Sequence, residues 1–155
     1  MTFADGIRAS SYTREELADL IEDLLVLQDE TINGSLRSTT SASFVTLSNA
    51  QVTVTPESGQ IVLIHFWVRF SHSVADDGIV LNIYRNSTTD ILTEGPLATT
   101  AESATNGNID WCGGHLLDTG QSGSTDYDIR FARVGSGGTV YVGNSHITAI
   151  VLTES

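Results

Sequence analysis

Two residues of the sequence could form a nucleophile and a base. Cys112 and His115 stand three positions apart in the segment Trp-Cys-Gly-Gly-His, and a thiol beside an imidazole is a combination that nucleophilic catalysis uses. The spacing meets no known mechanical requirement of such a pair, and a single cysteine in a β segment is typical of a small core residue. We therefore predict no catalytic residue and no enzymatic activity.

The four histidines are the residues best suited to bind a metal ion. His65, His72, His115 and His146 follow no metal-ligand spacing, although the first two stand near the ends of one predicted strand. One arrangement stays open, in which a metal ion on a symmetry axis takes one histidine from each subunit. The Asp-Asp-Gly sequence at 76–78 is typical of a hairpin turn rather than of a calcium loop. We predict no metal and no cofactor.

The charge of the chain makes nucleic acid an unfavourable partner. The 155 residues carry a net charge of −12, and all seven basic residues are arginines scattered singly along the sequence. A phosphate-binding surface needs clustered cations, so we expect no nucleic acid partner. No apolar run approaches the roughly 20 residues that span a bilayer, and residues 1–11 lack a secretory signal. We expect no membrane partner and synthesis in the cytoplasm. The missing lysine suits either a high-salt habitat or a GC-rich genome.

One long strand organises the sequence. Residues 60–71 are rich in β-branched and aromatic side chains and contain no turn residue. Side chains alternate across a strand, so one face carries Val62, Ile64, Phe66, Val68 and Phe70, and the other carries Ile61, Leu63, His65, Trp67 and Arg69. The first face is a sandwich core. The second would leave a large apolar patch in water, so we expect further copies of the same chain to cover it.

The remaining sequence after residue 43 is typical of an all-β sandwich or barrel. Short apolar segments alternate with Gly-rich turns. The predicted strands are residues 44–47, 51–55, 61–70, 79–85, a short one near 91, 108–117, 127–134, 140–143 and 146–153. The last of them is apolar on both faces, because His146, Thr148, Ile150 and Leu152 oppose Ile147, Ala149 and Val151. We expect it beside the long strand in a central sheet.

The N-terminal segment predicts an amphipathic helix. Thr13-Arg14-Glu15-Glu16 has the pattern of a capping box, and the helix should run from Arg14 to about Asp29. Its apolar stripe consists of Leu17, Leu20, Ile21, Leu24 and Leu27. This helix could pack on its own sandwich or reach a neighbouring chain, and the polar linker at 33–43 favours the second arrangement. We predict two units, an arm over residues 1–35 and a sandwich over residues 36–155.

The order of the β segments resembles a known family. The long two-faced strand is followed by Val-Leu-Asn-Ile-Tyr-Arg-Asn from 80, Gly-His-Leu-Leu-Asp-Thr from 114, Asp-Tyr-Asp-Ile-Arg-Phe-Ala-Arg from 126 and the closing strand. Over residues 44–153 this order is similar to that of the trimeric jelly rolls of tailed-virus virion proteins, which share their architecture with tumour necrosis factor and C1q. The resemblance implies that three inner sheets pack about a threefold axis. The implied interface residues are Leu63, His65, Trp67, Arg69, Ile150 and Leu152.

The resemblance also implies a function. A short arm without shaft repeats favours a capsid decoration (cement) protein, which assembles as a homotrimer and binds the major capsid protein or another virion protein. The expected location is therefore the virion. A tail or fibre component, or a receptor-binding tip, remains an alternative. A carbohydrate-binding module is a further one, for which an exposed aromatic platform at Trp111 or Tyr12 would speak.

Overall fold

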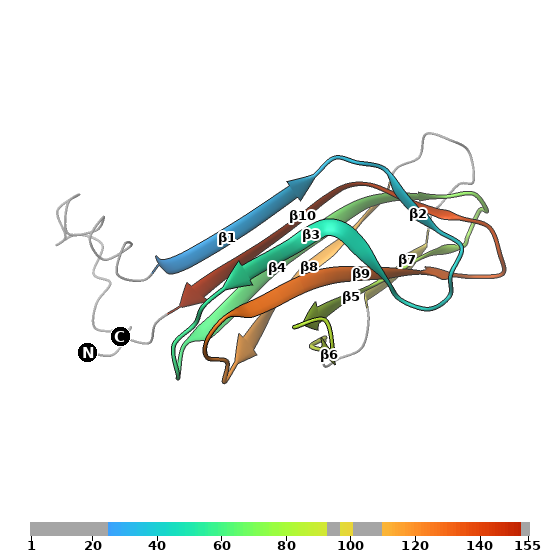
Figure 1. Ribbon diagram of the computed structural model, residues 1–155. Helices are drawn as coiled ribbons and strands as arrows, with labels where there is room; N and C mark the ends of the chain where they lie inside the picture. The colour runs from blue at the N-terminus through green and yellow to red at the C-terminus, as the bar shows by residue number, and fades with distance from the viewer. Residues whose placement is uncertain (1–24, 93–96, 101–109, 153–155) are drawn as a thin grey trace, which may run out of the picture.

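The chain folds into two antiparallel sheets that face each other. The structure is a computed structural model, and it describes residues 25–92, 97–100 and 110–152 (Figure 1). The first sheet has the order β1 (Leu25–Asn33), β10 (Val140–Leu152), β4 (Ile61–His72) and β8 (Asp110–Thr119), and β2 (Arg37–Thr39) also pairs with β10. The second sheet has the order β3 (Val45–Val54), β9 (Thr125–Val134) and β5 (Gly78–Arg85), with β6 (Thr89–Asp90) and β7 (Leu97–Thr100) both paired with β5. The prediction of an all-β sandwich is confirmed.

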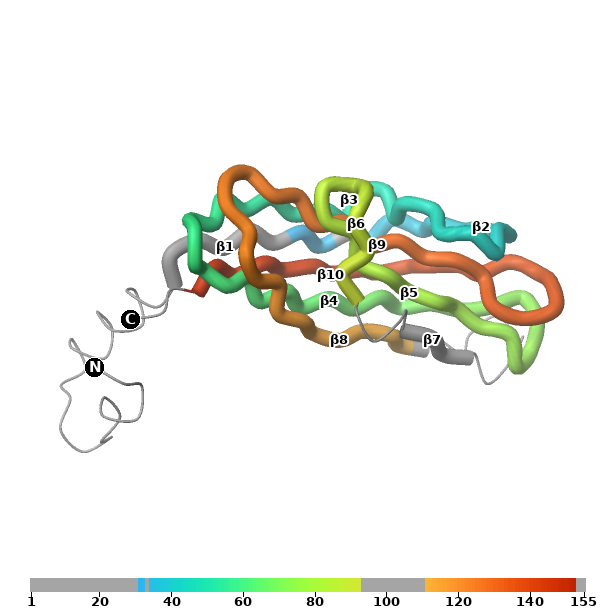
Figure 2. The backbone as a smooth tube through the Cα atoms, turned by 90° about the horizontal axis from the view of Figure 1, so that it is seen from below, coloured from blue at the N-terminus to red at the C-terminus, as the bar shows by residue number. Residues whose placement is uncertain are grey.

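The two central strands of the first sheet pair along almost their whole length. Strand β10 runs antiparallel to β4 from Leu152 opposite Ile61 to Val140 opposite His72. This confirms the prediction that the closing strand lies beside the long strand. Figure 2 shows the same two strands running next to each other.

The core lies between the sheets. The inward side chains of β4 are almost completely buried, as predicted for the face that carries Phe66 and Phe70. They meet inward side chains of the second sheet, chiefly Ile79, Leu81, Ile83, Tyr127, Ile129 and Phe131. Fully burying one such side chain stabilises the fold by roughly 1.5–3 kcal/mol.

In two places, two segments that were predicted as separate strands form one continuous strand with a bulge. Strand β3 runs without interruption over Val45–Val54, and its register shifts between Thr46 and Gln51, where Asn49 has a φ of 60°. Strand β10 continues through Gly143 and shifts register between Val142 and Ser145. The polar and glycine residues at these positions bend the strand without ending it, because a bulge accommodates the extra residues within one ladder.

The N-terminal prediction is wrong where the structure describes it. Residues 25–29 belong to β1 rather than to a helix, and β1 pairs with β10 from Leu25 opposite Leu152 to Asn33 opposite Ser145. Leu27 therefore lies in a strand, and the boundary expected at residue 35 falls after an integral strand of the first sheet. Pairing along β10 outweighs the local helical pattern, since tertiary context overrides propensity. The other predicted helix residues, Leu17, Leu20, Ile21 and Leu24, lie outside the described residues.

The turn after β9 needs a glycine. Gly135 has a φ of 109°, and a Cβ there would collide with the carboxylate of Asp77, which accepts a hydrogen bond from the N–H of Gly137 at 3.1 Å. Gly135→Ala should lower the free energy of unfolding by about 2 kcal/mol, from backbone strain and the clash. Gly120→Ala is the matched control, because Gly120 also has a positive φ but open space around it. Equal melting temperatures of the two variants would contradict the clash.

Candidate functional site

The side of the first sheet that points away from the second sheet is the candidate site, and we call it the open face. It consists of the outward residues of three strands, which are Leu63, His65, Trp67 and Arg69 on β4, Trp111, His115 and Leu117 on β8, and His146, Thr148, Ile150 and Leu152 on β10. All six interface residues expected from the resemblance lie on this face. Their role in an interface stays a prediction.

Cross-strand pairing arranges the open face in rows. Leu63 lies opposite both Leu117 and Ile150, which makes an aliphatic row. In the next row, His65 lies opposite His115 and Thr148. Directly opposite residues of neighbouring strands have Cβ atoms about 5 Å apart, so each row is in contact.

An aromatic cluster occupies the following rows. The ring of Trp67 lies 4.9 Å from that of Trp111 and stacks on His146 at 5.6 Å, measured between centroids. Gly113 lies opposite Trp67, and a Cβ at this glycine would come within 2.6 Å of the Trp67 Cβ. A glycine is therefore required beside Trp67 for β8 to approach it. The sequence reasoning missed this role, which the alternation of Trp111, Gly113 and His115 along β8 could have indicated.

Large apolar side chains remain exposed on the open face. Trp111 is 59% exposed and Leu117 is 60% exposed, while Leu63, Trp67 and Ile150 are partly buried. Ile32 of β1, which pairs with His146, adds another side chain at 69%. A contiguous apolar patch of this kind marks an interaction surface in a folded protein.

The open face carries none of the chain's abundant negative charge on its three main strands. Among the described outward residues of β4, β8 and β10, none is Asp or Glu, although the chain has 19 acidic residues. The cation on this face is Arg69, whose Nε is buried without a hydrogen-bond partner and whose guanidinium lies 5.8 Å from the Trp111 ring centroid. Copies that met through the described outward residues of β4, β8 and β10 would therefore bring no carboxylates of these strands together.

The residues that could have been a nucleophile and a base do not meet. Cys112 points into the core and is buried, whereas His115 points outward from the same strand. Burial raises the pKa of the Cys112 thiol to about 11, so the thiol stays protonated at neutral pH. Across the described residues, no three His, Cys, Asp or Glu side chains are placed to hold a metal ion.

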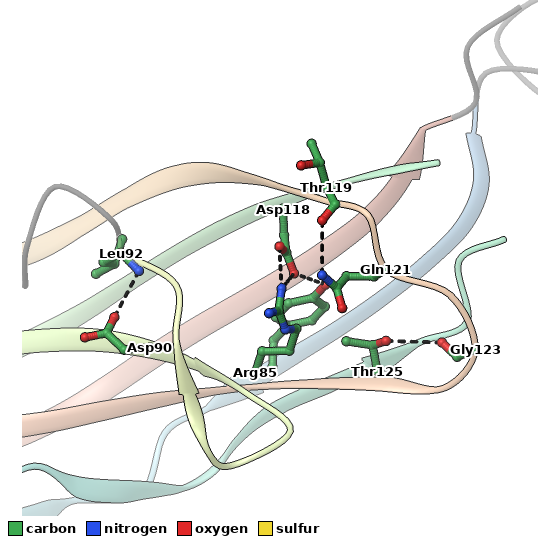
Figure 3. A network of polar contacts seen from close by, with 9 residues as sticks. Arg85, Asp90, Leu92, Asp118, Thr119, Gln121, Gly123 and Thr125 are labelled. Carbon is green, nitrogen blue, oxygen red and sulfur yellow. Dashed lines mark hydrogen bonds and ion pairs between the residues drawn. The ribbon is translucent and has the colours of Figure 1, made fainter. Parts of the chain in front are cut away.

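A second candidate is a cleft of about 550 Å³ between β8 and residues 89–92. Arg85 and Asp118 line this cleft, and Nη1 of Arg85 donates hydrogen bonds to both carboxylate oxygens of Asp118, at 2.7 and 2.9 Å (Figure 3). The Tyr127 hydroxyl donates to the same carboxylate at 2.9 Å. Burial, followed by the hydrogen bond to Asp118, raises the pKa of Tyr127 above its ordinary range. Asp118 belongs to the first sheet, and Arg85 and Tyr127 belong to the second. Their contacts therefore hold the two sheets together at one end of the sandwich.

Comparisons with known proteins show the fold. The chain matches no protein-family model and no curated protein. It aligns with the T=1 particles derived from infectious bursal virus at a TM-score of 0.54 and 13% identity, over 81% of this chain and 32% of that one. It aligns with the VP2 subviral particle of infectious bursal disease virus at 0.54 and 11%, over 83% and 33%. Eiger TNF from S. frugiperda gives 0.51 and 12%, over 83% and 94%.

The coverage of these matches differs. The chain spans about a third of the length of the viral chains and nearly all of the TNF chain. In the part of the chain that the structure describes, no helix is long and apolar enough to cross a membrane. At identities this low, the likeness establishes a shared β-sandwich, and function has to be argued from the open face.

Proposed function

We propose that this protein is a structural component of a virus particle, and specifically a trimeric decoration (cement) protein on the capsid of a tailed virus. The observation that carries the proposal is the open face, an apolar and aromatic surface without carboxylates on its main strands in a chain of net charge −12. Exposed apolar patches mark interaction surfaces, and further copies of the same chain would cover this one without bringing carboxylates of β4, β8 or β10 together. The proposal includes no enzymatic activity.

The arrangement of the strands supports a jelly roll. From β3 onward the chain crosses to the first sheet at β4, returns for β5 to β7, and crosses again at β8, β9 and β10. Jelly rolls place eight strands in two such sheets. Two of the solved chains that share this fold form virus-derived particles and a third is a TNF, and the resemblance to TNF-like trimers favours three copies.

The mass of the purified protein tests the self-association. Light scattering at micromolar concentration should give three times the 16.6 kDa of one chain. A folded monomer would overturn the trimer. Electron microscopy of particles from the source virus, with antibody against the protein, should then place it on the head rather than the tail.

A carbohydrate-binding role is the second candidate, because the exposed ring of Trp111 lies beside the partly buried ring of Trp67. Aromatic rings on a flat sheet face can stack on sugar rings. If soluble oligosaccharides protected the Trp fluorescence from a quencher in solution, and the protein had a monomeric mass, this role would be favoured over the virion role. A fibre tip or tail component would instead show a trimeric mass and a location on the tail.

The segment before β1 is the proposed attachment element, because it carries Leu17, Leu20, Ile21 and Leu24 among acidic residues. Truncation should begin at Leu25, since β1 is part of the sheet. A protein lacking residues 1–24 should keep the trimeric mass and lose co-sedimentation with undecorated particles. Retained co-sedimentation would mean that the attachment surface lies on the sandwich.

A further inference from the structure

We propose that a small pocket beside the bulge of β10 binds a carboxylate group, with the guanidinium of Arg69 as its counter-ion. The carboxylate belongs either to a free small acid or to an Asp or Glu side chain of another copy, and both sources offer the pocket the same chemistry. The inference does not rest on the proposed assembly, because a free acid needs only one chain.

The bulge of β10 creates the pocket. Val142 lies opposite Phe70 and Ser145 lies opposite Val68, so Gly143 and Asn144 of β10 together face the single residue Arg69 of β4. A bulge of this kind places two residues against one, and Gly143 has no side chain to fill the space beside Arg69. The resulting pocket has a volume of about 120 Å³.

Arg69 is a partly buried cation that lacks a counter-ion in the described part of the chain. Its Nε is buried and has no hydrogen-bond partner there. Hydrogen bonds are donated by each of the other described arginines, which are Arg37, Arg85, Arg130 and Arg133. A buried donor without an acceptor costs free energy, and a water molecule would accept its hydrogen bond without neutralising the charge. An anion in the pocket would do both.

Three neutral polar residues line the same pocket. Ser71 lies opposite Tyr141 in the row after Arg69, and Asn144 belongs to the bulge. Each of these side chains has an O–H or N–H group that can donate to an anion. Among the described residues that line the pocket, none is acidic. The pocket therefore offers several donors and one positive charge, with no carboxylate of its own to compete for them.

The number of charges favours a carboxylate over other anions. A guanidinium holds a carboxylate through two parallel hydrogen bonds, and the single charge of Arg69 matches the single charge of this group. A phosphate dianion would leave an excess negative charge in a chain whose net charge is already −12. The pocket therefore suits the carboxylate end of a ligand.

The experiment is a titration of the full chain with sodium acetate near neutral pH, in which sodium chloride keeps the ionic strength constant. The backbone N–H signals of Gly143 and Asn144 report binding by nuclear magnetic resonance. They should shift and saturate with a dissociation constant of roughly 1–10 mM, a range reasonable for a charged ligand of few atoms. Acetamide has the same shape without the charge, and it should cause no saturating shift.

Three variants test the role of the guanidinium. Arg69→Gln should weaken acetate binding by at least about tenfold, because a charge-assisted hydrogen bond is lost. Arg69→Lys keeps the charge but lacks Nε and the planar fork, so it should also bind acetate more weakly than the wild type. Arg37→Gln is the matched control, since it removes the same charge from β2, the strand that pairs with β10 next to the bulge. Its dissociation constant should stay close to that of the wild type.

The absence of a saturating shift with acetate would overturn the inference. An equal shift with acetamide, or unchanged affinity in Arg69→Gln or Arg69→Lys, would overturn it as well. Light scattering during the titration distinguishes the two sources: a mass that falls with acetate but not with chloride assigns the carboxylate to another copy, and a constant mass assigns it to a free acid. A monomeric protein that binds acetate would refute the proposed assembly and still support this site.

Discussion

Leu63→Asp should convert the assembled protein into folded monomers. Leu63 lies in the aliphatic row of the open face, between Leu117 and Ile150, and its side chain is outside the core. In the proposed assembly this substitution places one carboxylate per copy against apolar surface. Burying an unpaired charge costs at least several kcal/mol per site, which exceeds what the lost leucine contacts contribute. Light scattering at about 10 µM should give the monomer mass.

A matched variant tests whether the loss of assembly depends on the open face or follows from adding a carboxylate at any exposed position. Thr46→Asp adds a carboxylate to an exposed position of β3 in the second sheet, and it should leave the assembled mass unchanged. Both variants should keep the circular dichroism spectrum of the wild type. If Leu63→Asp keeps the assembled mass, the open face is not the interface.

Asp118→Ala should cause the largest loss of stability of any single substitution proposed for this protein. Its carboxylate accepts from Arg85 and from the Tyr127 hydroxyl, and it is 8% exposed. Removing it leaves a partly buried guanidinium and a buried hydroxyl without their acceptor. Breaking a buried pair in this way costs about 3 kcal/mol, near the lower limit because Arg85 keeps some contact with water. Differential scanning calorimetry should show a fall of roughly 10 °C in Tm.

Two controls test this assignment. Tyr127→Phe should cost only about 1 kcal/mol, because Arg85 still pairs with Asp118. The double variant Arg85→Met, Asp118→Leu should recover part of the loss, since no charge is left unpaired. A double variant as unstable as Asp118→Ala would mean that the loss comes from packing.

Alkaline pH gives an independent measure of the same network. The folded protein holds the proton of Tyr127, whose pKa is raised, while an unfolded tyrosine ionises near pH 10. Above about pH 10 the unfolded state therefore binds fewer protons than the folded state, and stability falls as the pH rises. Tyr127→Phe should lose less stability than the wild type between pH 9 and pH 11.

The parts of the fold that were predictable are those with a strict period of two. Strand β4 alternates between fully buried residues such as Phe66 and outward residues such as Trp67 over its whole length, so both of its faces could be assigned. Strand β10 is apolar on both faces, which indicated a central position. These patterns depend only on which side chains are buried, and the alternation of apolar and polar residue types in the sequence indicates that directly.

Other parts depend on partners that are distant in the sequence. Strand β1 has acidic and apolar residues at a spacing that suits a helix, and it becomes a strand because β10 offers a hydrogen-bonding edge. The contribution of β8 to the open face was missed because Gly113 and Gly114 interrupt its apolar pattern. The need for a glycine at position 113 becomes visible only in the structure, because a Cβ there would collide with the Phe66 carbonyl oxygen and the Trp67 Cβ.

The pairing of Leu25 with Leu152 sets the mechanical response of the sandwich. Both ends of the described chain leave from the same end of two antiparallel neighbours, so tension between them acts across the β1–β10 ladder. Ladder bonds run perpendicular to the strands, and such a pull opens them one after another instead of shearing them together. The β4–β10 pairing and the core would experience little force until β1 had peeled away. If the proposed virion role is correct, expansion of the particle would therefore strain this subunit at its edge strand while the rest of the sandwich kept its shape.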